Sequence, residues 1–377
     1  MSDTSNCAAE AALEGILVVS LEQAVAAPYC SRLLSDAGAR VIKLERKEGD
    51  FARAYDTVIE GQSAYFVWLN VGKESVAVDL RDAGDRALLE NLLKQADVFI
   101  QNLRFGAVER LGFGWDRLQS LNPRLVLCNI GGFAGDSPDA DRKAYDALIQ
   151  AETGLCSVTG PEGVPSKVGV SVCDISSGLT AFGEILKALI LRNRTGRGKR
   201  IDCSLFGTIA EWMAVPWAYY RFAGRVPTGR GMDHGQIAPY GDFNAADGKV
   251  FIVVQNDREW RALCDKVLCK PELISDARFA RNADRAANAS DLKDILNQCF
   301  SAFDCAALLS TLEDAGIACG TISTVADLDK HAALRLKAIT VSGRAVPMIL
   351  REGDTQSRPQ TPPDLDQHGT AVREEFR

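Results

Sequence analysis

One aspartate lies where a carboxylate could act as a nucleophile. Asp174, in the sequence VCDISSG, ends an extended run that begins at Ser166 and opens a long helix expected over residues 175–194. Backbone N–H groups and the dipole at the start of a helix favour the ionised form of a carboxylate. Such an aspartate could form a covalent intermediate. It could also be a simple helix cap, which is the commoner role of an aspartate at this place, and the residues alone leave both interpretations open.

Two neighbouring polar residues, Tyr145 and Asp146 in AYDALIQ, form a second candidate group. A tyrosine with an ordinary pKa of about 10 is a poor base for proton exchange. Asp146 could orient an acyl group, or it could be a hydrogen-bonded structural acid.

The stretch TGRGMDHGQIAPYGDF is rich in glycine and contains one of the three histidines of the chain. Glycines allow backbone conformations that suit a mobile lid over a site; the candidates are Gly229, Gly231 and Gly235. His234 between them could bind a carboxylate, although a histidine in a loop is more often structural.

The composition excludes several classes of protein. The chain has 377 residues, of which 46% are hydrophobic and 25% charged, and a formal net charge of −7. The acidic balance disfavours nucleic acid as a partner. The eleven cysteines contain no CxxC pair, so they are expected to be reduced thiols of a cytoplasmic protein, with no structural metal. The absence of an apolar stretch of roughly 20 residues argues against a membrane protein.

The first third of the chain alternates short β-branched runs with helical patterns. This alternation predicts an α/β fold with an open, mostly parallel, Rossmann-like sheet that binds its ligand beyond the carboxyl ends of the strands. The first strand-to-helix turn, SLEQAVAAP, has no glycine, which excludes a nicotinamide-binding fingerprint. The predicted strands span residues 15–21, 39–45, 98–102 and 124–130.

The later part of the chain predicts a second, smaller α/β domain. We expect a large catalytic domain over residues 1–205, completed by residues 330–377. Residues 206–240 are expected to be a linker or lid, because glycine and proline cluster from residue 224 onward, and residues 241–329 the small domain.

These segments, in their order along the chain, resemble the class III coenzyme A transferases. The resemblance covers almost the whole chain and rests on LEGILVVSLEQAVAAPYCSRLLSDAGARVIKLERKEGD, NVGKESVAVDL, ADVFIQNLRFGAVERLGFGWDRLQ, AYDALIQAETGL, VCDISSGLTAFGEILKAL, TGRGKRID and IAPYGDF. It implies an interlocked homodimer. It also implies coenzyme A or an acyl-CoA as a substrate, with a carboxylic acid as the other substrate and no metal.

The resemblance also implies roles for individual residues. Asp174 matches the aspartate that becomes an aspartyl-CoA thioester, and Tyr145 and Asp146 lie beside it. Ala24 and Val25 stand where many members carry Val-Gln, and Leu103 replaces an aromatic residue. The positions that match coenzyme A contacts are Ala24, Val25, Arg46, Lys73, Asn102, Leu103, Arg110, Leu111 and Lys143.

Within the family, the segments GMDHGQIAPYGDF and VQNDREW resemble most the enzymes that act on C4–C5 dicarboxylates such as mesaconate, citramalate, malate, succinate or itaconate. Two alternatives remain. An α-methylacyl-CoA racemase would carry histidine at the position of Tyr145, which argues against that branch. A non-catalytic coenzyme A-binding protein is disfavoured because the nucleophile and the basic positions are present.

Overall fold

The computed structural model describes residues 11–354 and 359–377. The chain divides into two compact units. The first comprises Met1–Cys156, Lys167–Arg225 and Arg335–Arg377, and the second comprises Ser157–Ser166 and Val226–Leu334. The segment 206–240, expected to be a linker, is therefore divided between the units after Arg225, and its first half is helical.

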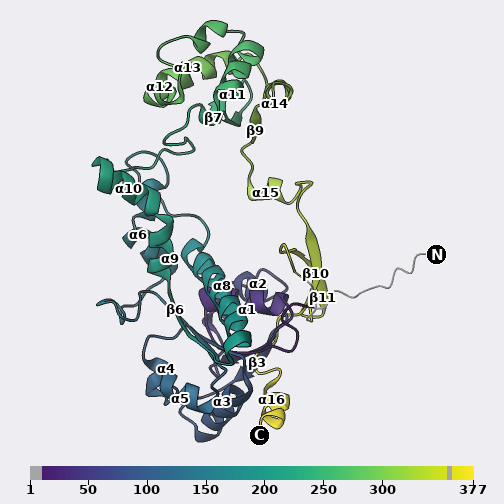
Figure 1. Ribbon diagram of the computed structural model, residues 1–377. Coiled ribbons are helices and arrows are strands. Elements are labelled where there is room, and N and C mark those ends of the chain that lie inside the picture. Colours follow the sequence, from purple (N-terminus) through teal and green to yellow (C-terminus); the bar gives the residue numbers. More distant parts are fainter. Residues whose placement is uncertain (1–10, 355–358) are drawn as a thin grey trace, which may run out of the picture. The chain divides into compact units, whose positions relative to one another are not determined.

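A six-stranded, fully parallel sheet forms the centre of the first unit (Figure 1). The strand order is β3-β2-β1-β4-β5-β6, so the direction of winding reverses between β1 and β4. Doubly wound sheets of this order bind ligands at that switch point. The strands are β1 (Leu17–Leu21), β2 (Arg40–Glu45), β3 (Glu74–Ala77), β4 (Val98–Gln101), β5 (Val126–Gly131) and β6 (Arg200–Ser204).

Alternate residues of these strands enter two separate cores. Val18 and Ile100 pack on one face with helices α1 and α8, whereas Val19 and Phe99 pack on the other with α3, α5 and α16. This pattern explains why the strands read as continuous apolar runs, because both faces are buried. The helices of this unit are α1 (Ala26–Asp36), η1 (Phe51–Ala54), α2 (Ala64–Asn70), α3 (Ala83–Gln95), α4 (Ala107–Arg110), α5 (Trp115–Leu121), α6 (Asp146–Glu152), α7 (Leu155–Val158), α8 (Val172–Thr195), α9 (Leu205–Trp212), α10 (Ala214–Ala223) and α16 (Gly369–Glu375).

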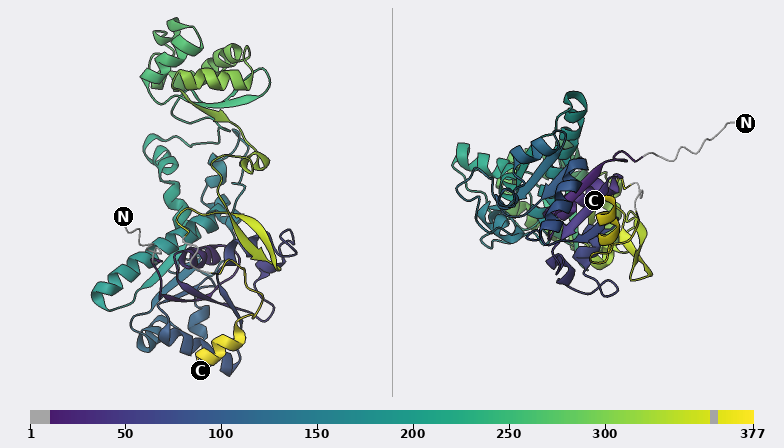
Figure 2. Two further views of the ribbon diagram at one scale, coloured as in Figure 1. Left: turned by 90° about the vertical axis from the view of Figure 1, so that its right-hand side faces the viewer. Right: turned by 90° about the horizontal axis from the view of Figure 1, so that it is seen from below.

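The carboxyl-terminal segment completes the first unit. The antiparallel hairpin of β10 (Leu336–Val341) and β11 (Arg344–Ile349) packs Ile339 and Val341 against Val67 and Val71, at the end of α2 (Figure 2). Helix α16 lies next to β3 and α3 through the Arg373–Asp85 ion pair of 2.8 Å. Both ends of the sequence therefore contribute to one core.

Helix α8 packs closely on α1. A Cβ atom at Gly178 would come within 2.5 Å of the carbonyl oxygen of Ala26, so only glycine allows the two backbones to approach this closely. The contact holds the start of α8 near the end of β1.

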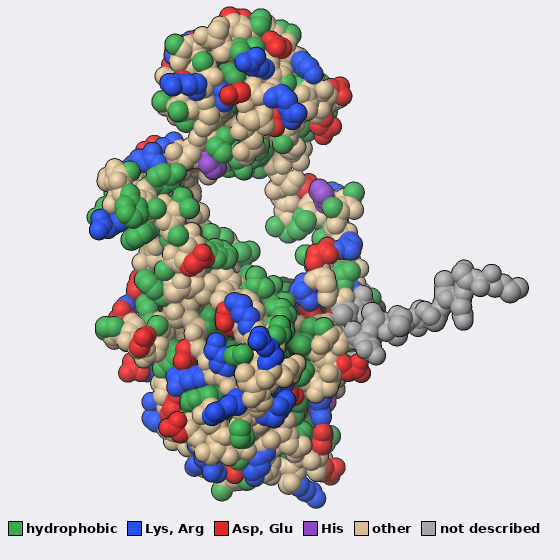
Figure 3. All heavy atoms as spheres, in the orientation of Figure 1, with side chains coloured by type: hydrophobic (Ala, Val, Ile, Leu, Met, Phe, Trp, Pro, Cys, Tyr) green, Lys and Arg blue, Asp and Glu red, His purple; other side chains and the backbone are tan. Residues whose placement is uncertain are grey.

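Helix α10 has a markedly apolar surface. None of its residues is buried in the chain, although it carries large hydrophobic side chains (Figure 3). With the adjoining end of α9, its exposed apolar residues are Trp212, Val215, Trp217, Tyr220 and Phe222. Patches of this kind mark interaction surfaces.

The second unit has a three-stranded antiparallel sheet, β7-β8-β9, covered by helices. Its core includes Trp260, Phe279 and Phe300. Among the described residues no single helix could span a membrane; only the pair α13 and α14, bent by 110°, passes by length and composition. The elements are β7 (Tyr240–Asn244), β8 (Lys249–Val253), α11 (Asp257–Ala262), η2 (Leu263–Val267), η3 (Pro271–Ile274), α12 (Asn282–Ala287), α13 (Ala289–Phe300), α14 (Cys305–Asp314), β9 (Ala318–Thr321) and α15 (Val325–Leu328).

Candidate active site

A cavity of about 270 Å³ opens at the carboxyl edge of the parallel sheet and contains Asp174. We call it the Asp174 pocket. The loops that follow β1, β4 and β5 supply most of its wall, as expected for a switch-point site. Its lining residues are Gln23, Ala24, Ala26, Phe51, Asn102, Leu103, Arg104, Phe105, Ile130, Gly131, Gly132, Ala140, Arg142, Lys143, Ala144, Tyr145, Asp174 and Leu205.

Asp174 lies in the first turn of α8, which begins at Val172. It is therefore not the cap of the helix, and the extended run before it ends earlier than the sequence suggested. The cap comes from another helix: Asp146 Oδ1 accepts the backbone N–H groups of Cys173 (2.7 Å) and Asp174 (3.3 Å). The carboxylate of Asp174 has no hydrogen-bond or ion-pair partner within the described part of the chain, so its oxygens are available to a ligand.

The sequence predicted that the start of the helix would favour the ionised form of Asp174, and the structure shows the opposite. Burial, together with the nearby charge of Asp146, raises the pKa of Asp174 to about 7. Desolvation therefore outweighs the helix dipole, which acts in the opposite direction. A carboxylate with such a pKa is more basic than a free aspartate, and about half of it is ionised near neutral pH.

Two tyrosines flank this carboxylate. Tyr145 lines the pocket and is exposed, and it precedes α6. Tyr55 follows η1; partial burial and the charges of Asp50 and Asp174 raise its pKa to about 12. Tyr55 therefore remains a hydrogen-bond donor near neutral pH. Asp146 itself does not line the pocket, because its side chain points to the start of α8.

The loops after β1 and β4 are joined at the switch point. Asn102 donates to the carbonyl oxygen of Gln23 (2.8 Å) and accepts its N–H (3.0 Å), so this amide is a structural link as well as a lining residue. Leu103 lines the pocket, as does Ala24, which has a φ of 63°. Val25 is buried and does not line it.

Two residues that were not predicted as site residues also line the pocket: Arg104 and Phe105, which come directly after Leu103. The ring of Phe105 lies against Gly131: a Cβ atom there would be 2.2 Å from the ring, so glycine is required for this loop position. Arg104 is exposed and lines the pocket, and its side chain has no hydrogen-bond or ion-pair partner among the described residues. The signal was present in the sequence, since both residues follow the end of a predicted strand.

Lys73, predicted to contact coenzyme A, lies inside the protein. It is 3% exposed, and its ammonium group donates to Glu22 (2.7 Å), the carbonyl oxygen of Pro28 (3.0 Å) and Asn70 (3.1 Å). All three donors of the group are used. Burial lowers the pKa of Lys73 to about 8, an effect that Glu22 partly offsets. Lys73 therefore does not line the Asp174 pocket; it holds the buried carboxylate of Glu22 at the end of β1.

The same buried network fixes the loop at Ala24. Lys43 pairs with Asp50 at 2.8 Å, and Asp50 Oδ1 accepts the N–H of Ala24 at 3.1 Å. Burial alone would raise the pKa of Glu22, but Lys73 and Lys43 outweigh it and bring the pKa to about 2. We call Glu22, Lys43, Asp50 and Lys73 the buried ion network.

The remaining predicted contacts of coenzyme A are dispersed in the first unit. Lys143 lines the Asp174 pocket, whereas Arg46 and Arg110 are exposed and do not. Leu111 lines a separate cavity of about 410 Å³, where its carbonyl oxygen accepts from Arg86. The structure thus brings together part of the predicted set around Asp174.

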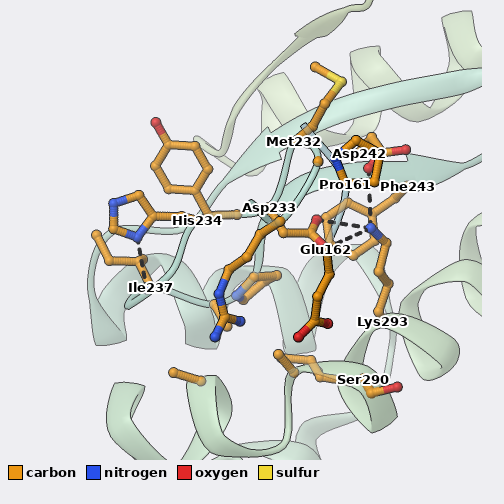
Figure 4. Close-up of a pocket in the computed structure, with 18 residues that line it drawn as sticks. Pro161, Glu162, Met232, Asp233, His234, Ile237, Asp242, Phe243, Ser290 and Lys293 are labelled. Carbon is orange, nitrogen blue, oxygen red and sulfur yellow. Dashed lines mark hydrogen bonds and ion pairs between the residues drawn. The ribbon is translucent and has the colours of Figure 1, made fainter. Parts of the chain in front are cut away.

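The predicted lid lies in the second unit, at a cavity of about 500 Å³ (Figure 4). Gly231 and His234 line this cavity, but Gly229 and Gly235 do not. His234 Nδ1 accepts the N–H groups of Gln236 and Ile237, both at 3.1 Å, and its ring stacks on Tyr240. The imidazole is thus held in place by its own loop.

The backbone of this loop is held by neighbouring carbonyl oxygens. Gly229 donates to Ser157 (3.0 Å) and Gly231 to Gly160 (2.8 Å). Lys293 at the cavity wall is neutralised by Asp233 and Asp242. Within the described residues no group of three His, Cys, Asp or Glu side chains could hold a metal ion.

The fold and the pocket define a doubly wound α/β protein with a partly buried, unpaired carboxylate at its switch point. Comparison with known proteins gives its family: residues 13–369 match the model of CoA-transferase family III, and the chain belongs to this family. It is an enzyme that transfers coenzyme A, and CoA thioesters are its substrates.

Several characterised relatives match almost the full chain. It is 36% identical to the acetyl-CoA:oxalate CoA-transferase of Acetobacter aceti, covering 100% of this chain and 98% of that protein. It is 32% identical to the succinyl-CoA:glutarate CoA-transferase of Mus musculus, covering 98% and 88%. Identity to the succinyl-CoA:mesaconate CoA-transferase of Haloarcula marismortui is 33%, covering 80% and 78%.

Solved structures have the same fold. The crystal structure of a CaiB/BaiF family protein from Brucella suis superposes with a TM-score of 0.80 at 34% identity, covering 97% of this chain and 99% of that one. A protein from Mycobacterium tuberculosis gives a TM-score of 0.83 at 25% identity, covering 96% and 98%. These likenesses confirm the predicted α/β class with its parallel sheet.

Proposed function

We propose that this enzyme moves coenzyme A between short dicarboxylic acids through a covalent aspartyl-CoA thioester at Asp174. The observation that carries the proposal is the unpaired carboxylate of Asp174, which lies in a cavity at the switch point of the sheet. The names of the relatives, which act on oxalate, glutarate and mesaconate, support dicarboxylates as the substrate class.

The reaction would run through two intermediates on the same side chain. An oxygen of the ionised Asp174 attacks the carbonyl carbon of the acyl-CoA, the C–S bond breaks, and the products are a mixed anhydride and the CoA thiolate. The thiolate then attacks the Asp174 carbonyl carbon and releases the donor acid as a carboxylate. The acceptor acid repeats these steps in reverse, so no net proton or electron is consumed.

The surroundings of Asp174 suit this sequence. A small, partly buried pocket limits access of water to the anhydride and the thioester, both of which hydrolysis would destroy. Tyr55, which remains protonated near neutral pH, is a suitable donor to the oxygen that gains charge during attack. Asp174 itself needs no separate base, because its ionised form is the nucleophile.

The size and charge of the pocket fit a short dianionic acid. The volume of about 270 Å³ is at the lower end for small-molecule sites. Its rim carries three basic side chains, Arg104, Arg142 and Lys143. Arg142 is already paired with Glu152 and Asp139, so Arg104 and Lys143 are the ones that suit a second carboxylate or the phosphates of coenzyme A. We propose C4–C5 dicarboxylates as the first substrates to test, with oxalate added because of the relative from Acetobacter aceti.

We also propose that the enzyme is a homodimer. The aromatic surface of α10, where no residue is buried within one chain, is best explained by cover from a second copy. Sedimentation of the purified protein would test this, and a monomer at micromolar concentration would contradict it.

The decisive experiment traps the covalent intermediate. The enzyme is incubated with succinyl-CoA, glutaryl-CoA or oxalyl-CoA, then treated with hydroxylamine, and the modified residue is located by mass spectrometry. We expect hydroxamate at Asp174 and none in an Asp174→Ala variant, which should lose turnover. Asp136→Ala, at an exposed position, is the control. Full turnover by Asp174→Ala would reject the covalent route, and exchange of the α-proton without an acceptor acid would favour the racemase reaction.

A further inference from the structure

The start of α8 is capped by a side chain from α6. Ser171, which precedes α8, makes no side-chain cap. Asp146 fills this place from α6, because its Oδ1 accepts the N–H groups of Cys173 and Asp174 at 2.7 and 3.3 Å. The first backbone donors of a helix need such an acceptor when they are shielded from water. The backbone of Asp174 is therefore fixed by Asp146.

Asp146 is in turn fixed by Gln150, one turn later on α6. Gln150 is fully buried, and its amide nitrogen donates to Asp146 Oδ2 at 2.7 Å. Its amide oxygen accepts the N–H of Val168 at 2.8 Å, in the segment that leads into α8. Both oxygens of Asp146 are thus bonded within the protein, and its side chain does not line the Asp174 pocket.

We propose that Asp146 is a positioning residue: held by Gln150, it fixes the first turn of α8 and places a second negative charge behind Asp174 that makes this carboxylate a stronger nucleophile. This inference rests on the proposed function. It assigns Asp146 no contact with the substrate, in contrast to a role in orienting the acyl group.

The arrangement has a chemical consequence. The Asp146 charge adds to burial in raising the pKa of Asp174. A more basic carboxylate attacks a thioester faster when ionised, and it leaves less readily from an anhydride than an ordinary acid does. The CoA thiolate would then expel the donor acid and not Asp174, which drives the anhydride forward to the aspartyl thioester.

Other charged and titratable groups also face this carboxylate. Asp146 belongs to another helix, α6. Cys173 is the neighbour of Asp174 on α8, and Tyr55 comes directly after η1. Groups of the pocket wall complete the set: Tyr145, Arg104, Arg142 and Lys143. Among them Asp146 alone is an acid, so removing its charge should lower the proton affinity of Asp174.

The test uses Asp146→Asn, which keeps an oxygen acceptor for the cap but removes the charge. The single-turnover rate of hydroxamate formation is measured from pH 5 to 9 with one acyl-CoA. In the wild type we expect the rate to rise with a midpoint near 7. In the variant the midpoint should fall by about one pH unit, a roughly tenfold decrease in proton affinity, and the plateau rate should fall severalfold.

Two further variants separate charge from position. Gln150→Met should lower the plateau rate but keep the midpoint near that of the wild type, because Asp146 remains charged but is less well held. Asp141→Asn removes an exposed charge next to α6 and should change neither quantity.

The outcomes distinguish this inference from the proposed function. If the wild type forms no covalent adduct, the proposed function fails. If the wild type forms the adduct, the proposed function stands. The role of Asp146 is then overturned by either of two results: the pH dependence of the wild-type rate has its midpoint near 4, or Asp146→Asn has the same midpoint and plateau rate as the wild type. The wild-type midpoint also tests the inference if a variant does not fold.

Discussion

Two groups of carboxylates lie at the same edge of the parallel sheet, and the protein treats them in opposite ways. In the buried ion network, Glu22 is paired with Lys73 at 2.7 Å, and its pKa falls to about 2. In the Asp174 pocket, the carboxylate of Asp174 has no ion-pair partner among the described residues, and burial together with the charge of Asp146 raises its pKa to about 7. Glu22 is buried and Asp174 is only partly buried, yet Glu22 has the lower pKa, so the difference comes from pairing and not from burial.

The comparison shows which residues have structural roles and which remain available for chemistry. A buried charge that is paired contributes to the fold, and breaking the pair is costly. A carboxylate left without a partner costs stability, and such cost is typical of catalytic groups. We therefore expect substitutions in the two groups to have opposite effects on stability and on activity.

The largest effect is expected for Asp174→Asn. Turnover should fall on the order of 10⁴-fold or more, because the nucleophile is lost. The folded pKa of about 7 lies above the ordinary value of 3.8, so ionisation destabilises the wild-type fold as pH rises from about 4 to 7. The neutral variant escapes this loss and should be more stable at pH 8, by roughly 1–3 kcal/mol.

Urea unfolding of Asp174→Asn and wild type at pH 5 and pH 8 checks this prediction. The stability difference should grow between these values. A variant that is less stable than the wild type at pH 8 would show that the Asp174 carboxylate is paired in solution.

The second prediction concerns the buried ion network. Lys73→Met leaves Glu22 buried with the more distant Lys43, at 3.6 Å, as its nearest cation, and should lower the free energy of unfolding by roughly 3–5 kcal/mol. Adding Glu22→Gln should restore part of this loss, because the unpaired charge is removed. Chemical denaturation measures all three proteins. Lys47→Met, at an exposed position, is the control. A small loss in Lys73→Met would mean that water reaches this network.

The sheet and these two groups of carboxylates also show how much of the fold and of the candidate site could be predicted from the sequence. Four strands of the sheet were predicted within a few residues, because strands buried on both faces are continuous apolar runs. Strand β3, ESVA, was missed since it is short and polar at its start. The motif predicted Asp174 as the candidate nucleophile, which stays a prediction, but it did not predict the raised pKa of this residue, because desolvation and the charge of Asp146 depend on tertiary packing.

Lys73 also shows that the burial of a charged side chain cannot be predicted from its motif. Its motif predicted a contact with coenzyme A, but a lysine at the surface and a lysine buried beneath a loop have the same sequence pattern, and Lys73 is buried and bonded to Glu22. Arg104 follows the end of a predicted strand, which indicates a place near the ligand, but that its side chain lines the pocket depends on the conformation of the loop, in which Phe105 lies against Gly131.

The third prediction concerns the pH dependence of the wild type. The ionised form of Asp174 is the nucleophile, so kcat/KM should rise about tenfold between pH 6 and pH 8 and then level off. Glu22, with its pKa of about 2, should remain ionised throughout and contribute nothing to the profile. The measurement is kcat/KM for the acyl-CoA, from steady-state rates at saturating acceptor acid. A rate that is flat across this range would mean that a step other than attack by Asp174 limits turnover.

The smallest effect is expected for Arg104→Met. The side chain of Arg104 makes no hydrogen bond or ion pair within the described structure, so its removal should leave stability within about 0.5 kcal/mol of the wild type. Loss of its charge from the pocket wall should raise KM about fivefold for a dicarboxylate or for the acyl-CoA, with kcat little changed. The matched control is Arg32→Met on α1, where the buried arginine pairs with Asp36 at 2.7 Å. That variant should lose stability instead, because it leaves Asp36 with one fewer partner. If Arg104→Met were the less stable of the two, the division between unpaired charges at the pocket and paired charges in the interior would be wrong.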